Sequence, residues 1–118
     1  MVIPQRHYPS YAFDLPDEVL ARLILATKQV APLLDSAFDD VGRCAIFFEG
    51  FGGDHVHSKL FPMHGTANIA EWRPIESRSE RVVTRDDGDL SSHDAQRADD
   101  ERLAALADHI RRYGARLA

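Results

Sequence analysis

The sequence lacks three features that mark special classes of protein. It has a single cysteine, Cys44, so no disulfide forms within one chain, and a lone thiol in the apolar run 44–48 is typical of a reducing cytoplasm. No stretch approaches the ~18 consecutive apolar residues of a membrane span. The N-terminus has no charged leader followed by an apolar segment. We therefore expect a cytoplasmic protein with no membrane partner.

Positive charge is also scarce. Fourteen Lys and Arg face nineteen Asp and Glu, which gives a formal net charge of -5, and the sequence pI is near 5.6. This balance provides no general attraction to nucleic acid, so affinity for phosphate must be local and the ligand small. With 118 residues, 44% of them hydrophobic, the chain is long enough for one core. A single domain, 1–118, is expected.

Two segments have the pattern of helices. Residues 14–34 carry an apolar stripe at helical spacing, with Asp14 as a cap, Pro16 in the first turn and Pro32 expected to kink or end the last turn. Residues 99–114 form the second predicted helix, with Asp99 as its cap and Gly114 as its stop signal.

Between the helices, the sequence predicts an antiparallel hairpin. Its first strand is the apolar segment 43–48, a glycine-rich turn follows, and the second strand is 55–61, which Pro62 should stop. Residues 63–98 read as irregular, apart from a strand-like segment at 81–84. The expected fold class is α+β, a small antiparallel sheet packed against a long helix, with a C-terminal helix.

The second strand carries the residues with the clearest chemistry. His55, His57 and Lys59 alternate, so in an extended strand they share one face; we call them the row. Gly50, Gly52 and Gly53 precede the row and allow backbone N–H groups to approach a phosphate. Simpler explanations are a solvated sheet face for the row and a tight turn for the glycines.

These residues resemble the histidine triad family of nucleotide hydrolases and transferases, whose signature alternates three histidines with apolar residues. The matching strand is His55-Val56-His57-Ser58-Lys59-Leu60-Phe61-Pro62. The resemblance covers residues 2–62 and includes two earlier segments, Val2-Ile3-Pro4-Gln5-Arg6-His7-Tyr8 before the long helix and Phe13-Asp14-Leu15-Pro16-Asp17-Glu18 at its start.

The chain departs from the family pattern in two places. Lys59 replaces the third histidine, a position where the transferase branch of the family usually carries glutamine. The chain also begins within what resembles the fourth strand of the family, so the strands before it, and the acidic residue that binds ribose in relatives, have no counterpart here. The resemblance and the open sheet edges imply a homodimer, or a protein start upstream of Met1.

The resemblance implies a nucleotide hydrolase or nucleotidyl transferase acting on a nucleoside phosphoramidate or dinucleoside polyphosphate, with no cofactor. An imidazole that is neutral near pH 7 is a good nucleophile toward phosphorus. His57 is therefore the expected nucleophile, oriented by a backbone carbonyl near the first histidine, as in the family. His55 would support its ring, Lys59 would neutralise charge on a phosphate oxygen or protonate the leaving group, and the glycines would bind phosphate.

Two other functions remain open from the sequence. The first is a non-catalytic nucleotide- or phosphate-binding protein that keeps the row without the pocket. The second is a metal-binding domain in which His64 joins His55 and His57. Lys59 argues against the second, because its charge would repel a cation. His7 is expected to be structural, Cys44 to lie in the core, and His93 and His109 to lie on the surface.

Overall fold

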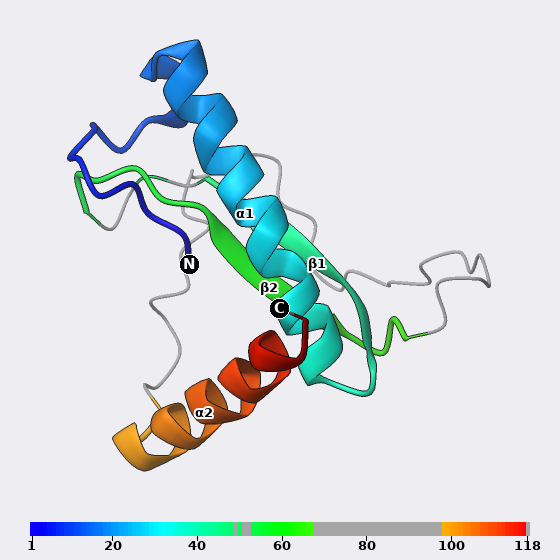
Figure 1. Ribbon diagram of the computed structural model, residues 1–118. Coiled ribbons are helices and arrows are strands. Elements are labelled where there is room, and N and C mark those ends of the chain that lie inside the picture. The colour runs from blue at the N-terminus through cyan, green and yellow to red at the C-terminus, as the bar shows by residue number, and fades with distance from the viewer. Residues whose placement is uncertain (49, 51–52, 68–97, 118) are drawn as a thin grey trace, which may run out of the picture.

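The protein is a β-hairpin covered by a long helix, with a second helix at one end (Figure 1). The computed structural model describes residues 1–48, 50, 53–67 and 98–117. The elements in chain order are a 3-10 turn (Ala12–Asp14), α1 (Asp17–Ala37), β1 (Val41–Phe47), β2 (Lys59–His64) and α2 (Asp100–Leu117). The expected α+β class is confirmed.

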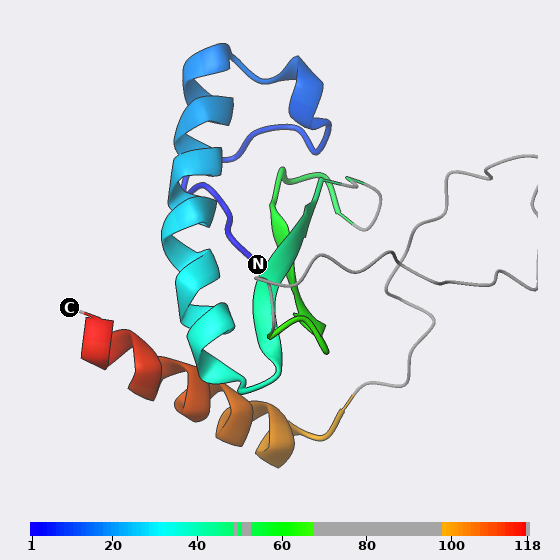
Figure 2. The ribbon, with the colours of Figure 1, turned by 90° about the vertical axis from the view of Figure 1, so that its right-hand side faces the viewer.

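Helix α1 lies along one face of the hairpin, and α2 crosses the C-terminal end of α1 (Figure 2). The N-terminal segment runs between α1 and the start of β2, so it lies close to the residues that precede that strand. None of the described helices is long and apolar enough to cross a bilayer.

The core forms where α1 meets the N-terminal turn and the segment before β2. Val19, Leu23 and Thr27 are buried at four-residue intervals, which places them on one face of α1. Val56 is completely buried against this face. Ile24, an apolar residue at helical spacing within 14–34, is 41% exposed, because the buried face is rotated toward Val19 and Leu23.

Both predicted ends of α1 were wrong. Asp14 is not its cap, because the 3-10 turn ends there, the Leu15 N–H donates to the Ala12 carbonyl, and α1 begins only at Asp17. At the other end, Pro32 does not terminate the helix, which continues to Ala37. A proline removes one intrahelical hydrogen bond, and contacts of the last turn with β1 (Asp35 with Cys44) and with α2 (Leu33 with Gly114) offset that loss.

The hairpin is present, but its strands are displaced from their predicted bounds. β1 starts at Val41, two residues early, and β2 begins at Lys59 rather than at residue 55. Pro62 does not stop β2, which runs to His64 with Pro62 opposite Cys44. A proline fits a strand where its nitrogen faces the open edge rather than the neighbouring strand. The pairing has an irregularity between Val41 and Cys44.

The segment that contains the two histidines pairs with the N-terminus of the chain instead of with β1. Val2 and Ser58 exchange two backbone hydrogen bonds, of 2.8 and 2.9 Å, in an antiparallel bridge. The Val56 N–H donates to the Tyr8 carbonyl at 3.1 Å. The expected strand at the start of the chain is therefore reduced to one bridge, but that bridge is what supports the row.

Helix α2 begins as predicted and ends later than predicted. The Asp99 carboxylate accepts the Arg102 N–H at 2.8 Å, so Asp99 is the N-cap. Gly114 does not stop the helix; it lies against Leu33 of α1, and the helix continues to Leu117. The strand-like segment 81–84 and most of the region predicted to be irregular lie outside the described residues.

Candidate functional site

The row keeps the alternation expected of a strand although only Lys59 belongs to β2. Val56 and Ser58 are fully buried, whereas His55, His57 and Lys59 are half-buried. Since α1 contacts the buried side, the row lies on the opposite face of the segment. Burial therefore alternates along residues 55–59 as the sequence predicted, and His55 and His57 are in direct contact.

His57 is oriented by a neutral acceptor. Its Nδ1 lies 2.9 Å from the backbone carbonyl oxygen of His55. A carbonyl oxygen only accepts, so Nδ1 carries the hydrogen and donates it. In the neutral ring the lone pair is then at Nε2, on the opposite side of the imidazole. This is the kind of acceptor that the sequence resemblance implied.

His55 points back to the N-terminal segment. Its Nε2 lies 3.1 Å from the Pro4 carbonyl, so Nε2 carries the hydrogen in this contact. The His7 ring meets the His55 ring edge to face, with centroids 5.3 Å apart. His55 is therefore fixed by its surroundings, consistent with the supporting part expected of it.

A second set of contacts ties the turn before the row to the N-terminal segment. His7 Nε2 lies 2.6 Å from the Asp54 carbonyl oxygen, and the Ser10 N–H donates to the Asp54 carboxylate at 3.0 Å. His7 is therefore structural, as expected. The His7–Asp54 and Ser10–Asp54 contacts join residues 47 and 44 positions apart, which no local pattern in the sequence could indicate.

Lys59 is the first residue of β2 and lies opposite Phe47 of β1. On the same face, two residues along the strand, Phe61 contacts Phe47 edge to face with ring centroids 5.3 Å apart. Along the segment, Lys59 therefore stands between the two histidines and the Phe47–Phe61 pair. Phe47 and Phe61 are 44% and 39% exposed.

Two of the three glycines expected to bind phosphate, Gly50 and Gly53, differ in backbone conformation and in the space around them. Gly50 has a φ of +72°, and a Cβ at this position would lie 3.0 Å from the Ser10 carbonyl oxygen, so the backbone itself requires glycine. Gly53 has open space around its Cα, and its carbonyl accepts the His55 N–H at 2.8 Å. Gly52 lies outside the described residues.

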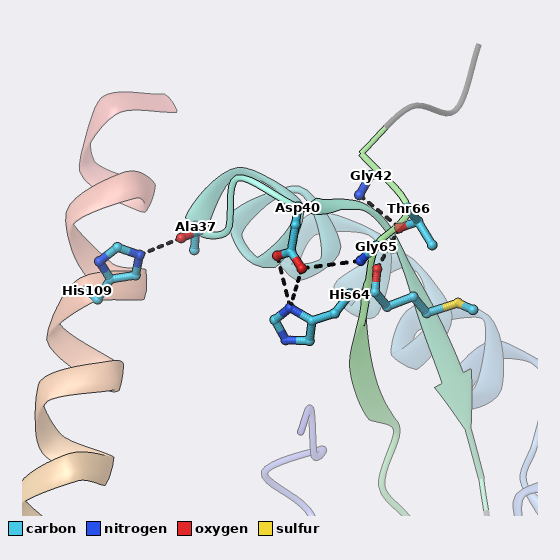
Figure 3. Close-up of polar contacts among 8 residues, drawn as sticks. Ala37, Asp40, Gly42, His64, Gly65, Thr66 and His109 are labelled. Atoms are coloured by element: carbon cyan, nitrogen blue, oxygen red, sulfur yellow. Dashed lines mark hydrogen bonds and ion pairs between the residues drawn. The ribbon is translucent and has the colours of Figure 1, made fainter. Parts of the chain in front are cut away.

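His64 is separated from the row and belongs to a polar cluster at the far end of the hairpin (Figure 3). Its Nδ1 lies 2.9 Å from the Asp40 carboxylate, which also accepts the Gly65 N–H at 3.2 Å. Thr66 donates its hydroxyl to the Met63 carbonyl and accepts the Gly42 N–H. We call this set the far-end clamp, because it joins the loop after α1 to the end of β2.

The hydrogen bond from His64 lowers the pKa of Asp40 below its ordinary value of 3.8, with a further contribution from the Gly65 N–H. Because His64 is occupied in this way, it does not complete a metal site with the row. Within residues 1–48, 50, 53–67 and 98–117, no group of three or more His, Cys, Asp or Glu side chains is placed to hold a metal ion.

The sequence contains two further histidines, His93 and His109, and one cysteine, Cys44. His109 is half-buried and hydrogen-bonds through Nε2 to the Ala37 carbonyl, so the expectation of a surface residue was wrong. His93 lies outside the described residues. Cys44 is half-buried and donates to the Asp35 carboxylate at 3.1 Å. Burial, together with the nearby carboxylate, raises the pKa of Cys44 to about 12, so its thiol is unreactive.

A cavity of about 420 Å³ lies between the N-terminal segment and α1, and is lined by residues that include Pro4, Arg6, Arg22 and Leu23. No member of the row lines it. Pro4 forms part of its wall and also provides the carbonyl that His55 contacts. The cavity and the row are therefore linked through Pro4, but the row forms no part of the cavity wall.

Comparisons with family models, curated proteins and solved structures found no match.

Proposed function

We propose that the chain is a divergent relative of the histidine triad family that hydrolyses or transfers a nucleotidyl group through a covalent intermediate on His57. The observation that carries the proposal is the 2.9 Å contact between His57 Nδ1 and the His55 carbonyl. It holds the ring in one tautomer, and it can stabilise the cation that forms when Nε2 bonds to phosphorus.

In the first step, the lone pair of His57 Nε2 attacks the phosphorus of a nucleoside phosphoramidate. The P–N bond to the leaving amine breaks, and the amine leaves with the bonding electrons and takes up a proton. The imidazole then carries the nucleotidyl group on Nε2 and still donates Nδ1–H to the carbonyl of His55. Lys59 neutralises charge on a non-bridging oxygen as it builds up.

In the second step, water attacks the phosphorus on the side opposite His57. The P–Nε2 bond breaks, its electron pair returns to the ring, and the nucleoside monophosphate is released after the water has lost its proton to solvent. An alcohol or phosphate in place of water gives the transferase reaction. The phosphoramidate or dinucleoside polyphosphate substrates are suggested by the sequence resemblance.

The test compares the turnover of adenosine 5′-phosphoramidate by the wild-type chain and by His57→Ala. We expect release of AMP by the wild type, loss of that release in the variant, and, after a rapid alkaline quench that preserves the acid-labile P–N bond, an added adenylyl group on His57 in mass spectrometry. Equal rates for the two proteins would overturn the proposal.

One observation favours a second candidate, a binding protein without catalysis. The cavity between the N-terminal segment and α1 lies near the site, but no member of the row lines it. Equilibrium dialysis with AMP separates the candidates. Binding of AMP that Arg22→Ala in the cavity wall weakens and His57→Ala does not, without turnover by the wild type, would support the binding protein.

A further inference from the structure

Two hydroxyl groups are buried directly behind the row. Ser58 lies between His57 and Lys59 in the sequence, faces α1, and is completely inaccessible to solvent. Its Oγ is 3.0 Å from Oγ1 of Thr27, which is 3% exposed. Thr27 Oγ1 is also 2.8 Å from the Leu23 carbonyl oxygen in the preceding turn of α1.

The donors and acceptors of this group can be assigned. The hydroxyl of Thr27 has one hydrogen, and the Leu23 carbonyl can only accept, so Thr27 donates to Leu23. The Ser58 hydroxyl must then donate to Thr27. These two hydrogen bonds connect Ser58, which lies within the row segment 55–59, to the backbone of α1 at Leu23. In the described part of the molecule, every buried side-chain nitrogen and oxygen atom has a hydrogen-bond partner.

Stability alone does not explain a polar pair at this place. The buried positions of a strand normally carry apolar side chains, as Val56 does two residues earlier. Replacing both partners of a buried hydrogen bond by apolar groups of similar shape is nearly neutral, whereas removing one partner is costly. What a hydrogen bond adds to apolar packing is direction.

Direction matters here because of the alternation of the segment. The backbone N–H and carbonyl of Ser58 are both bonded to Val2, and its side chain is bonded to Thr27, so the residue is fixed in three directions. A slip of one residue would exchange the two faces and turn the row toward α1. An apolar side chain at position 58 would resist such a slip only through packing.

We propose that Thr27 and Ser58 form a register lock, a positioning pair that fixes the face on which the row lies and so maintains the His57 contact with the His55 carbonyl. Neither residue touches the reacting atoms. The effect of the lock on turnover rests on the proposed function, but its effect on the ring of His57 does not.

The test uses Thr27→Val, Ser58→Ala and the double variant, with Thr27→Ser as the matched control that keeps the hydroxyl. Thr27→Val leaves the Ser58 hydroxyl unpaired, and we expect its melting temperature to fall by about 5 °C. The double variant should recover most of this loss. The ¹⁵N chemical shifts of His57 then report the share of the ring with hydrogen on Nδ1.

A register lock predicts that this share falls in the double variant although stability has returned, and that Thr27→Ser keeps the wild-type shifts. With a working enzyme, kcat of the double variant should fall at least about tenfold, while KM changes little. Wild-type ¹⁵N shifts in the double variant would overturn the proposal.

The two proposals fail in different ways. If the wild type does not cleave adenosine phosphoramidate but the His57 shifts move in the double variant, the proposed function fails and the lock stands. If the wild type and the double variant cleave it equally and their shifts agree, the function stands and the lock fails.

Discussion

The two ends of the hairpin each hold a histidine, and they hold it by different acceptors. Nδ1 of His57 meets a backbone carbonyl, and Nδ1 of His64 meets the carboxylate of Asp40, both at 2.9 Å. A carbonyl sets the tautomer without adding a full charge, whereas a carboxylate places a negative charge beside the ring. His57 is thus oriented without a neighbouring negative charge, whereas His64 is oriented beside one. A ring that is to attack an anionic phosphate needs the orientation but not the added negative charge.

The ends also differ in what they join. The row is tied to the N-terminal segment and, through Ser58, to α1. The far-end clamp joins the loop after α1 and the start of β1 to the last residues of β2 and the turn beyond (Figure 3). We therefore expect changes at the row to affect chemistry and changes at the clamp to affect folding.

The largest effect is expected from replacing each of the two histidines, His57 and His64, by alanine in separate variants. His57→Ala should lower turnover of adenosine phosphoramidate by at least about 10³-fold, because the nucleophile is lost. His64→Ala should leave turnover within about twofold of the wild type, because its ring lies at the other end of the hairpin. Steady-state kinetics and thermal melts of both variants test this. A comparable loss of turnover in the two variants would remove the distinction between the ends.

The next effect concerns Lys59. Lys59→Gln keeps a hydrogen-bond donor and removes the charge, and we expect kcat to fall by about 10- to 100-fold with little change in melting temperature. Lys59→Arg is the matched control and should retain more activity than the glutamine variant. Full activity of Lys59→Gln would show that the row needs no positive charge at its third position.

A smaller effect, on stability, distinguishes the two positive-φ glycines. Gly50 (φ +72°) and Gly65 (φ +77°) share a backbone conformation, but a Cβ would meet the Ser10 carbonyl only at Gly50. Gly65→Ala should cost about 1 kcal/mol for the conformation alone. Gly50→Ala should cost about 2 kcal/mol or more, since the neighbouring backbone must also move. Urea unfolding measures both, and equal losses would contradict the contact with Ser10.

The smallest effect is the acid dependence of the clamp. Because the pKa of Asp40 is lowered in the folded protein, its contact with His64 stabilises the fold above about pH 4 and is lost as the pH falls through that lowered value. Asp40→Asn should therefore be less stable than the wild type near neutral pH, and the difference should shrink below pH 4. Unfolding at several pH values checks this, with Asp39→Asn as control. A difference that stays constant with pH would contradict the pairing.

Periodicity was enough to predict the elements of the fold that depend on local pattern. It located α1, α2 and the hairpin, and it placed the row on one face. It did not locate their ends: Pro32 and Gly114 lie inside helices because tertiary packing outweighs local propensity. Pro62 lies inside β2 because its nitrogen needs no partner at an open edge.

The row was predictable, and the contacts that hold it were not. The Thr27–Ser58 and His7–Asp54 contacts join residues 31 and 47 positions apart, and each residue type is ordinary where it stands. One signal was present: a serine at a position where the alternation calls for an apolar side chain. A polar residue on a predicted buried face indicates a partner, but a single sequence does not say which one.

The hydrogen bond between His109 and the Ala37 carbonyl has a consequence for synthesis of the chain. The last carbonyls of a helix have no partner within it, and the one at Ala37 receives its partner from a residue 72 positions later. During synthesis, the Ala37 carbonyl at the end of α1 therefore has no partner from His109 until α2 has left the ribosome. A nascent chain that stalls before residue 109 should carry a frayed first helix, exposed to proteases at the end that α2 covers in the finished protein.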